Sequence, residues 1–178
     1  MDDKDAQDLI ATAVERSAGV WVELGAGSGT FTRALAAVLQ APSRIHAIDT
    51  DRRALAVIEG ESSAPGVEIV TIHGDFTDAA VIARVGDVRL DGVLAANALH
   101  FVRDMERVLG VWASRLVEGG RIVVIEYDRR AASLWVPYPV PPARLADVAM
   151  HLGLPVPRIT ATRPSEYSGE LYVATISV

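Results

Sequence analysis

The sequence contains no cysteine, so disulfides, thiolate metal sites and cysteine nucleophiles are excluded. Basic residues are also in short supply, with 17 Lys and Arg against 23 Asp and Glu, which gives a formal net charge of -6. A chain of this charge lacks a general phosphate-binding surface, which argues against nucleic acid as its partner.

Long hydrophobic runs are missing too. The longest uncharged run, Ala131 to Ala143, contains four prolines and is shorter than the ~20 residues that a membrane helix needs. Met1 is followed by acidic residues, whereas a signal peptide begins with basic ones. We therefore expect no membrane span, no targeting segment and a cytoplasmic location.

Histidines are few and scattered. None of the four stands at metal-ligand spacing from another; they are His46, His73, His100 and His151. We predict no metal site.

The composition is that of a globular chain, with 50% hydrophobic and 22% charged residues over 178 positions, a length that suits one domain. Strands are predicted at residues 20–24, 45–48, 67–72, 90–96, 121–125, 158–162 and 171–177. Helices are predicted at residues 5–17, 30–40, 52–59, 77–85, 104–116 and 142–152. This alternation indicates an α/β fold with a parallel sheet, and the last two strands, with no helix between them, should pair antiparallel.

A glycine-rich loop is the most informative segment. The first predicted strand runs into Gly25, Gly27 and Gly29 and then into a helix. Glycine permits positive φ and lets a ligand approach the backbone closely. Asp49 ends the second strand about 20 residues further on, where doubly wound folds place a ribose-binding carboxylate. The alternative is that Asp49 caps the next helix, although Asp51 is better placed for capping.

The loop does not fit a dinucleotide. The dinucleotide fingerprint Gly-x-Gly-x-x-Gly would need glycine where Thr30 stands. Glu23 also enters the loop, and its carboxylate would repel a pyrophosphate but favour an amino group and a sulfonium.

The segment from Glu23 to Gly29 resembles the first motif of the class I S-adenosylmethionine-dependent methyltransferases. The resemblance continues in the same order over about residues 8 to 127, at Asp49-Thr50, His73-Gly74-Asp75-Phe76, Ala95-Ala96-Asn97-Ala98-Leu99-His100 and Leu116-Val117-Glu118-Gly119-Gly120-Arg121. Glu118 stands where that family usually has proline in its Gly-Gly turn.

The resemblance implies a doubly wound sheet of seven strands in the order 3-2-1-4-5-7-6, mostly parallel with an antiparallel last strand and helices on both faces. The single domain, residues 1–178, would comprise an N-terminal helix (1–19), a cofactor-binding core (20–128) and a proline- and aromatic-rich loop, helix and hairpin (129–178). The implied cofactor is S-adenosyl-L-methionine, with Asp75 at the adenine amino group and Phe76 over the ring. The residues expected to contact it are Glu23, Gly25, Ala26, Gly27, Ser28, Gly29, Asp49, Thr50, Asp75, Phe76 and Asn97.

The acceptor side is less clearly marked. His100 follows the fourth strand, where the acceptor should approach, and imidazole exchanges protons near neutral pH. It is our candidate base; the alternatives are that it caps the helix near Asp104 or hydrogen-bonds the backbone. Trp135 and Tyr138 are candidate substrate contacts, or else an aromatic plug that packs the terminal hairpin. Weaker candidates of the same kind are Tyr127, Arg163 and Tyr167.

These features favour a methyltransferase that acts on a small molecule, such as a natural-product hydroxyl or amine. The alternatives are methylation of RNA or protein, and a non-catalytic module that only binds the cofactor. Asn97-Ala98-Leu99-His100 departs from the Asn-Pro-Pro-Tyr motif of enzymes that methylate nucleic-acid amino groups. With no long insertion before the loop, the acceptor site is expected to be open or completed by a second copy in a homo-oligomer.

Overall fold

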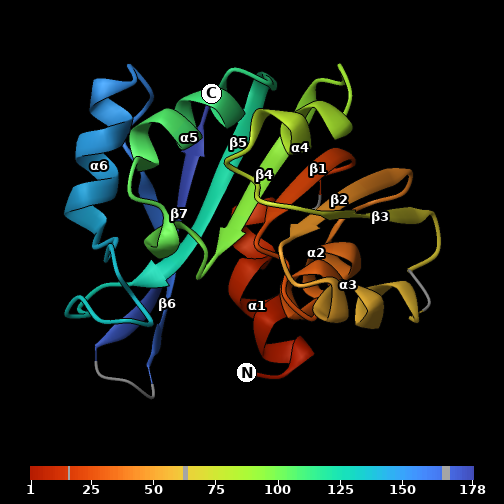
Figure 1. Ribbon diagram of the computed structural model, residues 1–178, viewed down its shortest axis with the longest axis horizontal. Helices are drawn as coiled ribbons and strands as arrows, with labels where there is room; N and C mark the ends of the chain where they lie inside the picture. Colours follow the sequence, from red (N-terminus) through yellow and green to blue (C-terminus); the bar gives the residue numbers. More distant parts are fainter. Residues whose placement is uncertain (16, 62–63, 166–168) are drawn as a thin grey trace.

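The computed structural model describes residues 1–15, 17–61, 64–165 and 169–178. Helices and strands alternate along the chain as Figure 1 shows. The elements are α1 (Asp3–Val14), β1 (Gly19–Leu24), α2 (Thr30–Val38), β2 (Ser43–Asp49), α3 (Arg52–Glu59), β3 (Val67–His73), α4 (Ala79–Arg84), β4 (Leu90–Ala96), η1 (Leu99–Phe101), α5 (Met105–Ala113), β5 (Leu116–Tyr127), α6 (Pro142–His151), β6 (Arg158–Pro164) and β7 (Glu170–Ser177).

The seven strands form one sheet in the order β3-β2-β1-β4-β5-β7-β6. The first five strands pair in parallel, and β7 lies antiparallel between β5 and β6. This confirms the predicted fold class and strand order. In such a sheet the order reverses between β1 and β4, so the chain leaves both strands at the same edge and in opposite directions, which opens a crevice there.

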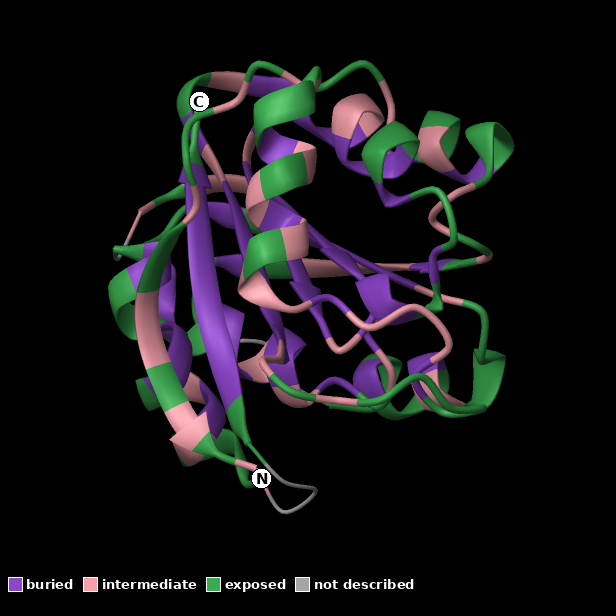
Figure 2. Ribbon diagram, turned by 90° about the vertical axis from the view of Figure 1, so that its left-hand side faces the viewer, coloured by how far each residue is buried: buried purple, intermediate pink, exposed green. Residues whose placement is uncertain are grey.

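The central strands contribute to two cores because side chains alternate between the faces of the sheet. Along β5, Ile122 and Val124 pack with α4, α5 and α6, whereas Val123 and Ile125 pack with α1 and α2. Helix α3 covers the same face as α1 and α2, through Leu55. Figure 2 shows the central strands buried and the outer surfaces of the helices exposed.

Aspartates begin the helices that follow β2, β3 and β4. The Asp51 carboxylate accepts hydrogen bonds from the N–H groups of Arg53 and Ala54 and caps α3. Asp78 caps α4 and Asp104 caps α5 in the same way. The cap of α3 is therefore Asp51 and not Asp49, and His100 does not cap α5.

The boundary between α5 and β5 differs from the prediction. The predicted helix to Leu116 is wrong, because α5 ends at Ala113 and Leu116 already belongs to β5, paired with Leu90. The register between β4 and β5 shifts between Leu90 and Gly92. This irregularity lets β5 run through Gly119 and Gly120, which we expected to precede the strand. The short helix η1 was not predicted either.

No helix in the described ranges is both long and apolar enough to cross a membrane.

Candidate functional site

A cavity of about 290 Å³ opens where β1, β2, β3 and β4 end, at the edge where the strand order reverses. We name it the glycine-loop cavity. Its lining residues come from the loops after these four strands; they are Gly25, Asp49, Thr50, Asp75, Phe76, Thr77, Asn97, Ala98, Phe101 and Val102. Six of the residues predicted for the cofactor therefore share one wall: Gly25, Asp49, Thr50, Asp75, Phe76 and Asn97.

The glycine loop takes its shape from left-handed backbone and from hydrogen bonds to β2. Gly25 has φ +75°, and a Cβ on it would lie 2.8 Å from the Cβ of Ala98. The N–H groups of Gly25 and Ala26 both donate to the carbonyl of Ile48. A side chain at position 25 would therefore close the approach between the loops after β1 and β4.

The Asp49 carboxylate links the loop to the end of β2. Its Oδ2 accepts from the Gly27 N–H at 2.7 Å, and its Oδ1 accepts from the Asp51 N–H at 2.8 Å. The side chain still lines the glycine-loop cavity and is only partly buried. A carboxylate oxygen has more than one lone pair, so the same group that fixes the loop can accept further hydrogen bonds from a ligand.

Asp75 and Phe76 follow β3 and line the same cavity. Asp75 Oδ1 accepts from the Thr77 N–H at 2.8 Å, which fixes the turn. The Phe76 carbonyl accepts from Trp112 Nε1 at 3.3 Å, which anchors the turn to the buried core of α5. An exposed carboxylate thus stands beside a half-buried aromatic ring.

Glu23 lies beneath the loop and not on the cavity wall. Its side chain is 1% exposed, and Oε2 accepts from the Thr32 hydroxyl at 2.5 Å. Burial raises the pKa of Glu23 to about 8, although the hydrogen bond from Thr32 opposes the rise. The carboxyl group ties β1 to α2, and its contact with a cofactor stays a prediction.

Three other loop residues also serve the shape of the loop. Ala26 is buried beside Leu55 of α3. Gly29, with φ +92°, is the residue before α2, and a Cβ there would lie 2.7 Å from Ile58. The Ser28 carbonyl accepts from Arg33 Nη1 at 3.0 Å. Like Gly27, these residues do not line the cavity, and their contact with a cofactor is likewise untested.

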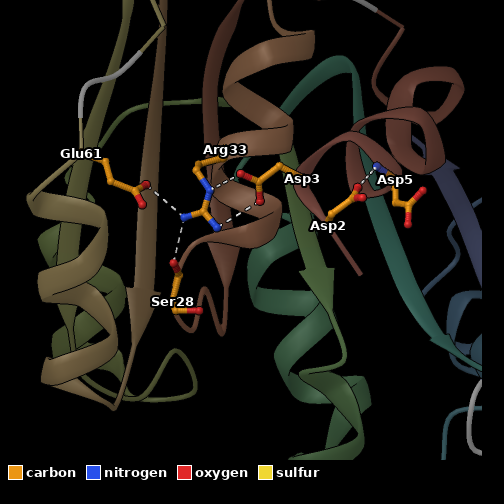
Figure 3. A network of polar contacts seen from close by, with 6 residues as sticks. All are labelled: Asp2, Asp3, Asp5, Ser28, Arg33 and Glu61. Carbon is orange, nitrogen blue, oxygen red and sulfur yellow. Dashed lines mark hydrogen bonds and ion pairs between the residues drawn. The ribbon is translucent and has the colours of Figure 1, made fainter.

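Arg33 was missed by the sequence analysis. Figure 3 shows its guanidinium at the centre of a network that joins three helical segments to the glycine loop. It pairs with Asp3 of α1 at 2.8 Å and with Glu61, just after α3, at 3.0 Å, while donating to Ser28. Asp3 and Glu61 lie 30 and 28 residues from Arg33 in the chain, so no local motif marks Arg33 as a loop-fixing residue.

Asn97 stands at the centre of the site. Its φ is +52°, its N–H donates to the Ile125 carbonyl at 2.8 Å, and its buried Oδ1 accepts no hydrogen bond from the residues that the structure describes. It lines the glycine-loop cavity and two neighbouring cavities. A buried, unpaired acceptor in a strained backbone conformation suggests a hydrogen-bond donor on the ligand.

The first neighbouring cavity, about 420 Å³, is named the His100 cavity. It is lined by Asn97, His100, Phe101, Tyr127, Arg130, Trp135 and Val136. Trp135 thus lies where a substrate contact was predicted, with its side chain 79% exposed. Tyr138 is not on this wall; its N–H donates to the His100 carbonyl at 2.9 Å.

The second neighbouring cavity, about 330 Å³, is lined by Met1, Asn97, Tyr127, Arg163, Pro164, Ser165 and Leu171. Arg163 is held there by an ion pair with Asp5 at 2.7 Å. Tyr127 contributes to both neighbouring cavities, so two of the weaker candidates, Tyr127 and Arg163, line cavities beside the glycine-loop cavity. The third, Tyr167, falls outside the described residues.

A buried pair joins His100 to Glu126, which the sequence analysis also missed. His100 Nδ1 lies 2.8 Å from Glu126 Oε2, and the His100 N–H donates to Glu126 Oε1 at 3.1 Å. Glu126 is 0% exposed and His100 is 4% exposed. Glu126 lies on the same face of β5 as Ile122 and Val124, which the alternation of the strand would have indicated.

The residues present fit S-adenosylmethionine. Two carboxylates and two aromatic rings line the glycine-loop cavity, and among the described residues no Lys or Arg does, so a pyrophosphate would find no cation there. A ligand with a sulfonium and an amino group suits this cavity, because the carboxylates attract the positive charge and, with the Asn97 amide oxygen, can accept hydrogen bonds from the amino group.

Within the described residues no group of His, Asp and Glu side chains is arranged to hold a metal ion.

Comparison with known proteins places the chain in a family. Residues 22–122, more than half of the chain, match the family described as methyltransferase domain. A ribosomal RNA small subunit methyltransferase H from Aromatoleum aromaticum is 32% identical over 125 residues, which are 67% of this chain and 35% of that protein. The chain spans about a third of the length of the curated relatives it matches, at 28% and 35%.

Solved structures share the fold at low sequence identity. A magnesium protoporphyrin IX methyltransferase from Synechocystis superposes with a TM-score of 0.74 at 11% identity, over 98% of this chain and 82% of that one. A Burkholderia thailandensis 1,6-didemethyltoxoflavin-N1-methyltransferase, solved with S-adenosylhomocysteine, gives 0.73 at 18% identity, over 98% and 77%. The chain belongs to the methyltransferase domain family and has the Rossmann-like class I fold of the S-adenosylmethionine-dependent methyltransferases.

Proposed function

We propose that this protein is an S-adenosylmethionine-dependent methyltransferase that acts on a small-molecule acceptor. One observation carries the proposal: the glycine-loop cavity and the His100 cavity meet at Asn97 and Phe101, which line both. A donor in the first and an acceptor in the second would therefore be neighbours. Holding two reactants in line can supply roughly 7–11 kcal/mol of the barrier reduction.

The cofactor is assigned to the glycine-loop cavity. Asp49 would accept hydrogen bonds from the ribose hydroxyls, Asp75 would accept one from the adenine amino group, and Phe76 would cover the adenine ring. The Asn97 Oδ1 would accept a hydrogen bond from the other amino group of the cofactor, the one beside its carboxylate. This bond would give the unpaired oxygen its partner. When bound, S-adenosylmethionine supplies a methyl group on a positively charged sulfur, already activated for transfer. Glu23 acts from below by keeping β1 and α2 together.

A small acceptor is supported by the dimensions and the charge of the acceptor side. The two neighbouring cavities measure about 420 Å³ and 330 Å³, within the range of small-molecule sites. The formal net charge of -6 disfavours a polyanionic acceptor. The Burkholderia neighbour, which is bound to 1,6-didemethyltoxoflavin, offers an example of a small acceptor on this fold.

RNA methylation is the second candidate, because the curated relatives in sequence are ribosomal RNA methyltransferases. The matched lengths cover only 28% and 35% of those proteins, so their RNA-binding parts need not be shared by this chain.

Two measurements test the proposal in order. Isothermal titration should detect binding of S-adenosylmethionine but not of NAD; no heat at millimolar cofactor would overturn the proposal. Incubation of the protein with labelled cofactor and a cell lysate should then place the label in the low-molecular-weight fraction. Label in the RNA fraction, removed by ribonuclease, would favour the second candidate instead.

A further inference from the structure

We propose that the acceptor is a planar aromatic compound that presents a hydroxyl group to His100, with Glu126 as the positioning residue for that histidine. The proposal rests on the proposed function for the methyl donor and adds the class of acceptor and the place of its proton. It is argued from the lining of the His100 cavity and from the buried His100–Glu126 pair.

The lining of the His100 cavity is unusually aromatic for a chain in which aromatic residues make up only 6%. The rings of His100 and Phe101 lie 4.4 Å apart between centroids, and the Tyr127 ring lies 6.3 Å from His100. Arg130 adds a guanidinium 5.0 Å above the Tyr127 ring. These contacts hold the rings together in one wall of the cavity, and an aromatic ligand in the cavity could add offset or edge-to-face contacts with that wall.

Two of these rings are exposed. Phe101 is 57% exposed and Trp135 is 79% exposed, and they come from η1 and from the loop after β5. The loop is held beside His100 by the hydrogen bond from the Tyr138 N–H to the His100 carbonyl, and by Arg144, which donates to the Tyr138 carbonyl. A planar ligand in the cavity that covers these two side chains would remove exposed apolar surface from water.

The proton would go to His100. Its Nδ1 faces the Glu126 carboxylate and so carries the hydrogen, which leaves Nε2 of the neutral ring as an acceptor. In the described residues Nε2 has no hydrogen-bond partner, and His100 lines the cavity. Glu126 is fully buried, so an imidazolium formed at His100 would meet an opposite charge that is already in place.

A hydroxyl uses this arrangement better than an aromatic amine does. An amine can attack through its lone pair before it loses a proton, whereas a phenol becomes a strong nucleophile when its proton leaves. In the step we propose, the O–H proton moves to His100 Nε2 and the oxygen lone pair forms the bond to the methyl carbon. The electrons of the broken carbon–sulfur bond stay on sulfur, which becomes a neutral thioether.

The test uses 4-nitrophenol, whose phenolate absorbs visible light while the phenol does not. At a pH about one unit below the midpoint of the free probe, only about a tenth of the probe is phenolate, and adding the protein should increase the phenolate absorbance at least two-fold, because His100 takes the proton. This readout needs no turnover, and it should appear with or without S-adenosylhomocysteine. Absence of binding, or a bound probe that titrates like the free one, would overturn the proposal.

Variants separate the roles of the residues. His100→Gln should abolish the absorbance change, and Glu126→Gln should reduce it several-fold while 4-nitroanisole, which has no hydroxyl, still binds. An unchanged spectrum shift in His100→Gln would remove His100 from the proposal. Because both side chains are buried, the binding of S-adenosylhomocysteine serves as the check that each variant has folded.

Trp135→Ala gives a second, independent arm, because an exposed side chain can be removed without disturbing the core. It should weaken binding of 4-nitrophenol about three-fold or more, whereas Leu134→Ala, which is 95% exposed and absent from the cavity wall, should not. Equal effects of the two variants would contradict an aromatic site. In the wild-type protein, cofactor binding without probe binding would refute this proposal alone, whereas absence of cofactor binding would refute the proposed function.

Discussion

The two halves of the site are built in different ways. On the proposed cofactor side, the Asp49 carboxylate accepts a hydrogen bond from the N–H of Gly27, 22 residues away in the chain, and the Ile48 carbonyl accepts from the N–H groups of Gly25 and Ala26. On the acceptor side, a buried side-chain pair, His100 and Glu126, faces a cavity with exposed aromatic walls. A cofactor common to a whole family needs one fixed cradle, whereas an acceptor is selected by side chains that can change.

The largest expected effect separates chemistry from cofactor binding. His100→Ala should lower kcat about 10²–10⁴-fold, the usual contribution of a general base, while the Kd for S-adenosylmethionine stays within about two-fold. His151→Ala is the matched control, since that exposed histidine on α6 pairs with Glu106 away from the cavities. Steady-state kinetics measures kcat, and isothermal titration measures the Kd for S-adenosylmethionine. A raised Kd for S-adenosylmethionine with a normal kcat in His100→Ala would mean that His100 belongs to the cofactor side of the site and not to the acceptor side.

Asp49→Ala should show the opposite pattern. Loss of charge-assisted hydrogen bonds, each worth roughly 1.5–3 kcal/mol, should raise the Kd for S-adenosylmethionine about 10–100-fold. Asp78→Ala is the control, because it removes the cap of α4 without touching the cavity wall. The comparison of the two Kd values by titration checks this. Equal affinities in Asp49→Ala and wild type would mean that the carboxylate only shapes the loop.

The pH dependence of stability tests the buried support of the cradle. Burial raises the folded-state pKa of Glu23 from its ordinary 4.5 to about 8, so the folded chain keeps a proton that the unfolded chain releases between these values. This contribution to stability is complete below the lower value and is lost as the pH rises toward the upper one.

Glu23→Gln should therefore be less sensitive to pH than wild type. Over this window the unfolding free energy of wild type should fall relative to the variant by up to about 1.4 kcal/mol per pH unit. Urea unfolding at several values between about pH 5 and pH 8 measures the difference. Parallel curves for the two proteins would show that Glu23 is ionised in the folded state.

The smallest effect is expected at Arg33. Its ion pairs are partly exposed, and such pairs contribute about 0.2–1 kcal/mol each, so Arg33→Gln should weaken cofactor binding about two- to five-fold through the Ser28 carbonyl. Arg44→Gln breaks an ion pair with Glu68 of comparable exposure but far from the loop, and should leave the Kd unchanged. Added salt should reduce the difference in cofactor Kd between wild type and Arg33→Gln, because salt screens the ion pairs of Arg33. A shared loss of affinity in both variants would point to a general effect of charge.

The cofactor half could be predicted from the sequence because its signals are local. Three glycines with positive φ and an acid at the end of the next strand fall at fixed spacing. Continuous apolar runs predict the buried strands. The strand order came from the resemblance that these motifs carry, and the pairing of β6 with β7 came from the missing helix between them.

The acceptor half could not be predicted in the same way. The pairing of His100 with Glu126 depends on β4 and β5 lying side by side, and the role of Arg33 depends on α1 and the segment after α3 converging on α2. The boundary at Leu116 failed for the same reason, because its partner Leu90 lies far away in the chain. A single sequence shows neither kind of contact, even where the strand positions are right.

A crystal structure with S-adenosylhomocysteine tests the central claim most directly. We expect the adenosine in the glycine-loop cavity, with the ribose hydroxyls within hydrogen-bond distance of Asp49 and the adenine against Phe76. We also expect the sulfur to lie toward Asn97, at the mouth of the His100 cavity. An empty glycine-loop cavity at saturating ligand, or a ligand bound elsewhere on the chain, would contradict the account.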